Sequence, residues 1–369
     1  MIDLIELETG HKKRIIEKLE DPRKAQILFF RVNGPKLQQR MDKLLPLEKV
    51  PRVFIHGNPH LDNYVRTFNG SGMVDFDRSR LGPYAWDIIR FFCSLDIYLN
   101  EGEGFVKKRV LDTFIDGYMQ TFQDLDIFYT RPSFVREIIP TEEELTIKNY
   151  AEANIKWAKR MRKSPVDVKD ERVVKMLHLF LESRNDLDLL KSYDLKEAGT
   201  SVGSLGKIHY LYFLEPKREG PDSILFDLKQ TYTEEDDQYF INPVEHHGLR
   251  MIKASNLYAP GIEQKLGYFT FEGVQYWGRE VPCFQSKINR ALLEEEQLEL
   301  SFCVGTQLGR GHRRSCRDVE PQELEKHLLD HRETLVQLAE FFNNEVKLGF
   351  EYIQKANELY KEQGIDLLQ

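Results

Sequence analysis

The chain has 369 residues, more than one typical domain, so we expect one bilobal unit or two domains. It is 41% hydrophobic and 30% charged, and its net charge of -8 and pI near 5.8 argue against general binding to nucleic acid or an anionic membrane. The four cysteines are widely spaced, which argues against a zinc cluster or a disulfide framework. The first residues are too acidic for a signal peptide, and no run of about 18 apolar residues occurs, so we expect a cytoplasmic protein.

The N-terminal part of the chain has a helical pattern. Apolar residues recur at helical spacing between residues 10 and 45. Within this part, 27–31 is an apolar run that is typical of a core helix or strand. Residues 50–55 then predict a short strand that leads into a polar loop.

Residues 55–77 predict a polar loop, a short hairpin with an Asn-Gly turn, and an acidic loop. Such a hairpin would bring Asn63 and Asp75 together, one at each end. An amide oxygen beside a carboxylate suits a hard cation such as Mg²⁺, which recruits phosphate oxygens. The alternative is a β-turn whose polar ends are merely solvated.

A chain break at Gly82-Pro83 precedes an apolar helix, and Asp87 falls near the start of that helix. Its carboxylate either caps the free N–H groups of the helix or reaches back to the preceding loop and makes it rigid. A second amphipathic helix follows over residues 106–122.

Residues 142–196 are highly charged and mostly helical in pattern. Within them, 157–163 is a basic run, which predicts a solvated helix face or, alternatively, a contact with phosphate. Strand patterns begin near residue 199, where a glycine-rich stretch precedes an antiparallel hairpin with strands over 208–214 and 223–230. Rossmann and Walker sites need a helix after the glycines, so this context favours a hairpin flap over nucleotide phosphates instead.

The remaining elements follow in order. Residues 243–252 predict a helix, in which the adjacent His246 and His247 do not share a face and make a poor metal pair. Residues 268–277 predict a hairpin, and 278–282 a linker between lobes. From residue 291 the pattern is helical, with Leu308, Gly309 and His312 on one helix and a long amphipathic helix near the C-terminus.

Several of these pieces together resemble known families. His56-Gly57-Asn58, Asn63 and the later 74–77 loop resemble the catalytic and metal-binding loops of kinase-like phosphotransferases, especially the aminoglycoside and choline kinase group. Residues 82–87, 201–207 and 225–230 resemble, more narrowly, the bacterial family catalogued as domain of unknown function 2252, over most of residues 28 to 316.

This resemblance implies an α+β, bilobal protein kinase-like fold with a small antiparallel β lobe and a large helical lobe. In ordinary kinases the flap, the lysine, the glutamate helix and the linker precede the catalytic loop. Here they follow it, so we expect a circularly permuted fold. The expected parts are a helical lobe with the catalytic loop over 1–196, a nucleotide-flap lobe over 197–285, and helices that return to the helical lobe over 286–369.

The resemblance also assigns roles to residues, with ATP and Mg²⁺ as the implied ligands. The metal ligands are Asn63 and Asp75, with Asp77 as an auxiliary acid. The cofactor-binding residues are Ser201, Gly203, Ser204 and Gly206 in the flap, Lys229 for the α- and β-phosphates, and Glu245, chosen on position alone, as the partner of that lysine. Ser201 replaces a glycine of the family pattern and would narrow the flap, and 278–282 would face the adenine.

One departure concerns the reaction itself. Asn58 fills the position of the catalytic aspartate, beside His56 at the start of the loop. An amide cannot take a proton from an acceptor hydroxyl, and general-base help is worth roughly 10²- to 10⁴-fold. Phosphoryl transfer depends mainly on positioning and charge, so reduced activity is compatible with this loop. Asp62 and His60 are alternative bases, although Asp62 is better placed to support Asn63.

These observations leave three functions open. The first is an ATP- and Mg²⁺-dependent phosphotransferase that transfers phosphate, or a nucleotidyl group, to an unidentified small molecule or protein. The second is a pseudokinase that binds nucleotide as a regulatory or scaffolding module. The third is a purely structural helical protein. Neither the acceptor nor the oligomeric state follows from the sequence.

Overall fold

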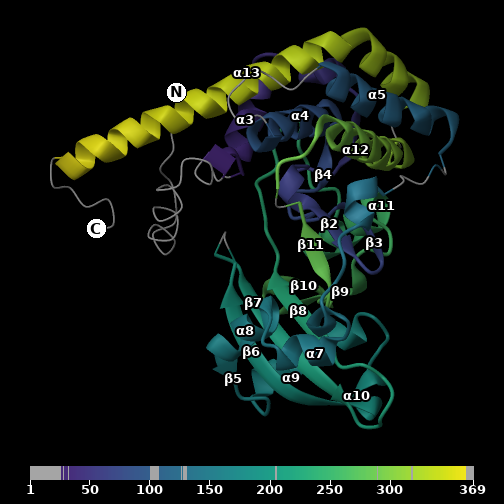
Figure 1. Cartoon of the computed structure of the whole chain (residues 1–369), viewed down its shortest axis with the longest axis vertical. Coiled ribbons are helices and arrows are strands. Elements are labelled where there is room, and N and C mark those ends of the chain that lie inside the picture. The colour runs from purple at the N-terminus through teal and green to yellow at the C-terminus, as the bar shows by residue number, and fades with distance from the viewer. Residues whose placement is uncertain are drawn as a thin grey trace.

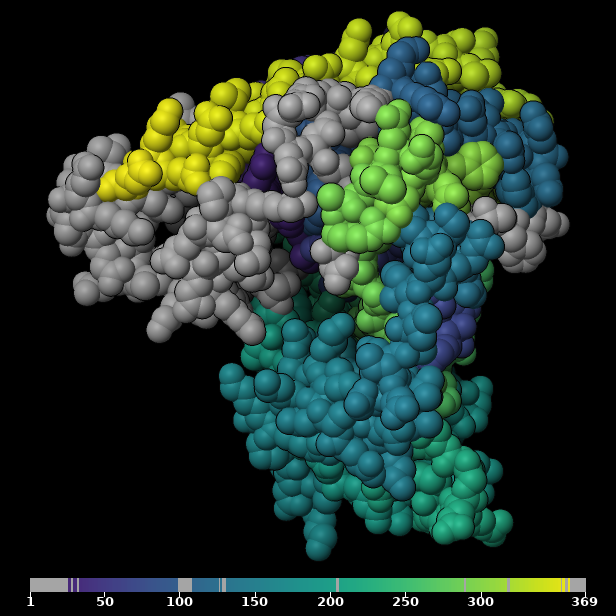
Figure 2. Space-filling model, viewed as in Figure 1, coloured from purple at the N-terminus to yellow at the C-terminus, as the bar shows by residue number. Residues whose placement is uncertain are grey.

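The computed structural model describes residues 26–362, apart from 28, 32, 100–107, 126, 128–130, 204–205, 289 and 317–318. It has a large, mainly helical lobe and a smaller β-rich lobe, joined by a narrower region of short strands (Figure 1). In the space-filling view the teal residues of the small lobe form the lower part of the molecule, and the yellow C-terminal helix crosses the top (Figure 2). This architecture confirms the predicted α+β, bilobal fold class.

The small lobe is built on a six-stranded antiparallel sheet in the order β5-β6-β7-β8-β10-β9. The strands are β5 (Pro165–Val166), β6 (Tyr193–Val202), β7 (Ile208–Pro216), β8 (Ile224–Gln230), β9 (Gln264–Phe271) and β10 (Val274–Glu280). Side chains alternate between its two faces, so Phe226 and Leu228 pack on one face while Leu225 packs on the other. The predicted flap and the 268–277 hairpin are therefore confirmed as β-hairpins.

Helices cover both faces of this sheet. The small-lobe helices are α7 (Ile147–Glu152), α8 (Lys156–Lys163), α9 (Glu171–Glu182) and α10 (Leu189–Ser192), with a short 3-10 turn η4 (Glu142–Glu144) before them. α11 (His247–Tyr258) lies between the lobes: it packs beside β9 and β10, and its Ala254 and Tyr258 belong to the core of the large lobe. α9 packs on one face, and α7 and α8 pack on the other. The segment 142–192, which the sequence grouped with the helical lobe, thus packs on the six-stranded sheet.

The basic run in α8 is largely a solvated helix face, as expected. Its buried residues are Ala158 and Met161, which face the sheet. On the outer side, Nε and Nη2 of Arg162 each donate to the carboxylate of Glu197 at 2.7 Å. Since these charges are at the surface, the pair contributes little to stability.

The large lobe is a helical bundle around one extensive apolar core. Its helices are α3 (Gly34–Met41), α4 (Ala85–Leu99), α5 (Lys108–Gln123), α6 (Ser133–Arg136), α12 (Glu294–Arg314) and α13 (Pro321–Glu362), with the 3-10 turn η2 (Leu47–Lys49). α13 lies along α4 and α5 at the top of the lobe (Figure 1). None of the helices in the described ranges has an apolar stretch long enough to span a membrane.

Two small sheets lie between the large core and the small lobe. β1 (Arg52–Ile55) pairs with β4 (Arg80–Pro83), and β2 (Tyr64–Thr67) pairs with both β3 (Gly70–Met73) and β11 (Gln285–Lys287). Thr67 pairs with Gly70, so the hairpin loop is Phe68–Asn69, one residue earlier than the Asn-Gly turn predicted. Because β11 follows the small lobe in the chain and pairs with β2, the chain re-enters the large lobe beside the predicted site.

The order of elements agrees with a circular permutation. The flap strands β6 and β7, the lysine strand β8 and the helix α11 all follow the loop at 56–63 in the chain. α12 follows them, yet it packs against β1, which precedes that loop, and against β3 of the hairpin that comes after it. The C-terminal part therefore completes the lobe that the N-terminal part begins.

Candidate functional site

The side chain of Asp87, on α4, fixes the backbone of the predicted catalytic loop. Its carboxylate accepts the backbone N–H of His56 at 2.6 Å and that of Gly57 at 2.9 Å. Gly57 has φ of +86°, and a Cβ atom built on it would lie 1.9 Å from the backbone oxygen of Arg78, so only glycine fits there. Of the two roles left open for Asp87, reaching back to the loop is confirmed.

Asp87 is itself held by a chain of buried side chains. Nε2 of His312, on α12, lies 3.0 Å from Oδ2 of Asp87, and its Nδ1 lies 2.7 Å from the hydroxyl of Tyr118 on α5. His312 and Asp87 are both fully buried. The helix that resembles the one preceding the catalytic loop in ordinary kinases thus supports this loop directly. Tyr118 was noted in the sequence only as part of an amphipathic helix.

The two expected metal ligands flank the base of the hairpin. The turn η3 (Leu61–Asn63) ends at Asn63, whose carbonyl oxygen accepts the N–H of Val74, next to Asp75, at 2.9 Å. Nδ2 of Asn63 donates to the Asn58 carbonyl at 3.2 Å, so its Oδ1 is turned away and remains available as a ligand. Asp75 has φ of +74°, an uncommon backbone conformation outside glycine.

The charge around Asp75 favours the ionised carboxylate. Burial alone would raise the pKa of Asp75, but the charges of Lys229, Arg31 and Lys287 outweigh it and lower the pKa. No group of three or more His, Cys, Asp or Glu side chains with metal-ligand geometry occurs within the described ranges. A cation held by Asn63 and Asp75 would therefore need further oxygen ligands, as Mg²⁺ does when phosphates and water complete its shell.

Lys229 on β8 pairs with Asp77 in the acidic loop, and both side chains are mostly buried. Burial would lower the pKa of Lys229, but the carboxylates of Asp77 and Asp75 outweigh it and raise the pKa. The expected pair between Lys229 and Glu245 does not form here. Glu245 is exposed and precedes α11, which begins only at His247. The sequence pattern predicts that this helix starts at residue 243, which is too early.

The flap residues lie at the turn between β6 and β7, except that Ser204 lies outside the described residues. Ser201 pairs with His209 across the hairpin. The N–H of Gly203 donates to the Lys207 carbonyl at 2.8 Å, and the N–H of Gly206 to the Gly203 carbonyl at 3.2 Å. In this conformation both amides are therefore used inside the turn and do not point freely at a phosphate.

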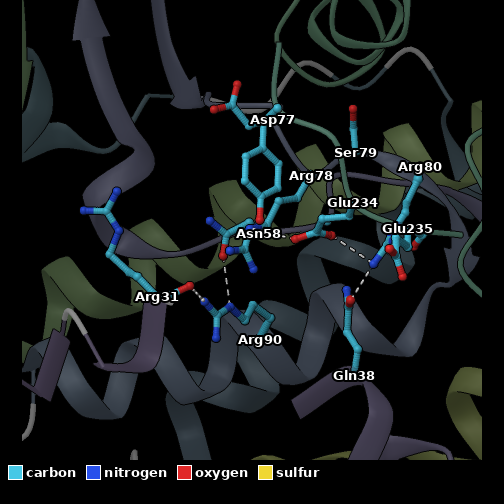
Figure 3. A network of polar contacts seen from close by, with 12 residues as sticks. Arg31, Gln38, Asn58, Asp77, Arg78, Ser79, Arg80, Arg90, Glu234 and Glu235 are labelled. Atoms are coloured by element: carbon cyan, nitrogen blue, oxygen red, sulfur yellow. Dashed lines mark hydrogen bonds and ion pairs between the residues drawn. The ribbon is translucent and has the colours of Figure 1, made fainter. Parts of the chain in front are cut away.

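Asn58 has a neighbour that the sequence analysis missed. Nε of Arg90, on α4, donates to Oδ1 of Asn58 at 3.0 Å (Figure 3). Nη1 of Arg90 donates to the Phe30 carbonyl at 2.9 Å. The guanidinium also stacks on the Phe30 ring, 3.6 Å from its centroid. A single arginine in the apolar run of α4 was the signal that could have indicated a buried polar role.

The other loop residues are also buried or paired. His56 and His60 are fully buried, and no hydrogen-bond partner within the described chain reaches Nε2 of His56 or either ring nitrogen of His60. Burial, with the nearby charges of Arg31 and Arg90, holds the pKa of His60 well below 6.5. Asp62 pairs with Arg31 at 3.4 Å and is about one-third exposed.

Two further residues that the sequence did not single out join the site to its surroundings. Arg250, on α11, donates to the backbone oxygens of Asp77 and Ser79 and so ties the acidic loop to the small lobe. Gln307, on α12, accepts the N–H of Met73 at 2.8 Å and donates to the Met73 carbonyl at 3.0 Å. Both positions look like ordinary helix residues in the sequence, because their partners are backbone atoms far away in the chain.

Comparison with known families divides the chain in two. Residues 5–123, which carry the loop at 56–63 and the acidic loop, match the phosphotransferase enzyme family, of the kinase-like superfamily. Residues 159–356, which carry the flap and Lys229, match the family described as an uncharacterized protein conserved in bacteria (DUF2252), starting later than the expected resemblance. No curated protein and no solved structure matches the chain. Since the second match covers more than half of the chain, the protein belongs to the DUF2252 family, and its fold is that of the kinase-like phosphotransferases.

Proposed function

We propose that this protein binds ATP with Mg²⁺ between its lobes and transfers phosphate to an acceptor that is a small molecule or a protein. The observation that carries the proposal is the convergence of Lys229, from the small lobe, on the loop that contains Asp75 and Asp77. Lysine and a metal-binding carboxylate on facing elements are the groups that hold triphosphate in this fold class. The phosphotransferase match over the same loop supports the proposal.

The residues present suit a magnesium–nucleotide complex. Asn63 offers a free amide oxygen, and Asp75 an ionised carboxylate. Mg²⁺ held there would neutralise charge on the phosphates. Lys229 would exchange Asp77 for a phosphate oxygen, because both are anionic partners within reach of the same ammonium group.

Nucleotide binding is tested by unfolding the protein with and without ATP·Mg²⁺. A ligand at 100-fold over its Kd stabilises the folded state by about 2.7 kcal/mol, and we expect a shift of that order. Asp75→Ala should abolish the shift, whereas Asp188→Ala, which changes an exposed aspartate of a small-lobe surface pair, should retain it. No stabilisation of the natural protein by millimolar ATP·Mg²⁺ would contradict the proposal.

The second candidate is a pseudokinase, and the contact between Asn58 and Arg90 favours it. The oxygen of Asn58 is engaged by Arg90, and an amide has no proton-accepting role at neutral pH. ATP consumption by the natural protein and by Asn58→Asp separates the two candidates. If only the aspartate variant turns over ATP, the natural protein is a nucleotide-binding module.

A further inference from the structure

The contact with Arg90 decides which way the side-chain amide of Asn58 is turned. The Nε–H of Arg90 can only donate, so the atom that faces it at 3.0 Å must be Oδ1. Burial lowers the pKa of Arg90 to about 9, so the guanidinium is still protonated at neutral pH. The Nδ2 group of Asn58 is consequently turned away from Arg90, with two N–H groups to donate.

This Nδ2 group donates to no atom of the described chain, and Asn58 as a whole is 8% exposed. Nδ2 is not among the fully enclosed atoms that lack a partner, so it reaches the surface of the site, where it can donate to water or to a ligand oxygen. Asn63 has the opposite orientation, with its nitrogen bound to the Asn58 carbonyl and its oxygen free. The loop thus presents a donor at residue 58 and an acceptor at residue 63.

Three arginine side chains lie around Asn58, and two of them are paired with carboxylates. Figure 3 shows the side chains of Arg31, Arg78 and Arg90 around Asn58. Arg31 is paired with Asp62 at 3.4 Å, and Arg78 with Glu234 at 3.3 Å. Arg90 has no carboxylate partner within the described residues, and its donors meet an amide and backbone carbonyls.

The guanidinium groups of Arg78 and Arg90 meet at one place. A Cβ atom built on Gly34, at the start of α3, would lie 2.2 Å from Nη1 of Arg78 and 3.7 Å from Nη2 of Arg90. The two cations are therefore next to each other below Asn58. Arg31 and Arg90 also act on the nearby His60: burial lowers its pKa most, and the positive charges of these two arginines lower it further.

Apart from Asp75, which is the expected metal ligand, the aspartates in and beside these loops have partners of their own. Asp77 is paired with Lys229, and Asp87 accepts hydrogen bonds from two loop amides and faces His312. Asp62 is paired with Arg31. In place of a base, the position beside the acceptor therefore has an amide donor next to Arg90, a cation without a carboxylate partner among the described residues.

We infer that the acceptor in the proposed phosphotransfer is an oxyanion, a carboxylate or phosphate group, and not a hydroxyl. This inference rests on the proposed function. An oxyanion is already ionised at neutral pH, so no base has to remove a proton from it. One of its oxygens forms a bond to the γ-phosphorus of ATP, the bond from that phosphorus to the β,γ-bridging oxygen breaks, and ADP leaves with the electron pair. Nδ2 of Asn58 holds the other acceptor oxygen.

The test uses inorganic phosphate and succinate as separate probes, each titrated calorimetrically into protein saturated with the ATP analogue AMP-PNP and Mg²⁺. We expect at least one probe to bind, and the probe that binds identifies a phosphate or a carboxylate acceptor. Asn58→Asp replaces the donor with a like charge and should weaken binding at least tenfold, about 1.4 kcal/mol. Asn58→Ala, which removes the donor without adding charge, should weaken it less.

Asn69→Asp is the matched control. It makes the same chemical change on the exposed loop between β2 and β3, away from Arg90, and should bind the probe as the natural protein does. Binding of the probe by Asn58→Asp as tight as by the natural protein would overturn the inference. So would a failure of both probes to bind to the natural protein, even when each is added to about 20 mM and at least about 50-fold above the protein concentration.

Turnover gives an independent result. We expect ATP consumption to rise with phosphate or succinate and to be unaffected by glycerol, a hydroxyl probe. Stimulation by glycerol that is lost in Asp62→Asn would show that Asp62 serves as a base, and would overturn the inference while leaving the proposed function intact. Failure of AMP-PNP itself to bind would remove the proposed function and the inference together.

Discussion

Lys229 on β8 and Asp77 in the acidic loop form an ion pair, although 152 residues separate them in the chain. The pair connects the small lobe to the loop that carries Asp75. Arg250 strengthens the same connection through the Asp77 carbonyl. The position of the acidic loop is therefore coupled to the small lobe through charged groups that a nucleotide would also contact.

Lys229→Met should destabilise the protein by about 3 kcal/mol, because it leaves the mostly buried Asp77 carboxylate without its cation. Asp77→Asn should cost a similar amount. The double variant should lose less than the sum of the two, since a shared contact gives a coupling of about 0.5–3 kcal/mol. Urea unfolding of the four proteins measures these values.

The control for this cycle is the pair between Lys191 and Asp188, which are 76% and 83% exposed. Lys191→Met should change stability by less than about 1 kcal/mol, because solvent screens exposed pairs. Strictly additive losses at Lys229 and Asp77 would contradict the coupling.

Asp87→Asn should loosen the loop at 56–63. The carboxylate accepts from two loop amides and faces His312, and an asparagine offers one oxygen in place of two. One backbone N–H is then left buried without an acceptor, which costs about 1–3 kcal/mol. Urea unfolding should show this loss, and hydrogen exchange at His56 and Gly57 should accelerate. Unchanged exchange at those two amides would show that the loop is held by other contacts.

Much of the site follows from local sequence. The hairpin between Asn63 and Asp75, the glycine flap and the strand that carries Lys229 each have a pattern of a few residues that predicts them. The resemblance of those short motifs also predicted the permuted order, because the order of motifs is a property of the sequence itself.

Contacts between distant segments were predicted less well. Glu245 was chosen as the partner of Lys229, but the choice between acidic residues depends on where α11 begins and on how the lobes approach. Arg90 was missed because its role depends on the carbonyl of Phe30 and the amide of Asn58, which only the folded chain brings together. Likewise, residues 142–192 were assigned to the helical lobe, because a highly charged helical pattern does not show on which lobe the helices pack.

His60 should make stability depend on pH between about 5 and 7. Its pKa in the folded chain lies well below 6.5, so the unfolded chain takes up a proton first as the pH falls. The contribution of His60 is complete above pH 6.5 and decreases below it, by at most about 1.4 kcal/mol per pH unit. His56, whose pKa burial also lowers, acts in the same direction.

Urea unfolding midpoints at pH 7.5, 6.5 and 5.5 measure this dependence. His60→Gln should reduce the slope, whereas His178→Gln, on the exposed side of α9, should leave it unchanged. Carboxylates with lowered pKa values, such as Asp75, lose their contribution only as the pH falls below about 4, outside this window. An unaltered slope in His60→Gln would contradict the assignment.

Gly305→Ala should destabilise the large lobe, even though alanine favours a helix interior by about 1 kcal/mol over glycine. α5 and α12 cross closely here, and a Cβ atom built on Gly305 would lie 2.1 Å from the Phe114 carbonyl oxygen. Because that atom belongs to the backbone of α5, a whole helix has to shift, and overpacking of this kind costs about 1–3 kcal/mol. We therefore expect a net loss in urea unfolding, together with weaker ATP·Mg²⁺ binding, since α12 also carries the His312 that holds Asp87. A gain in stability would show that the two helices separate easily and that the loop does not depend on their close contact.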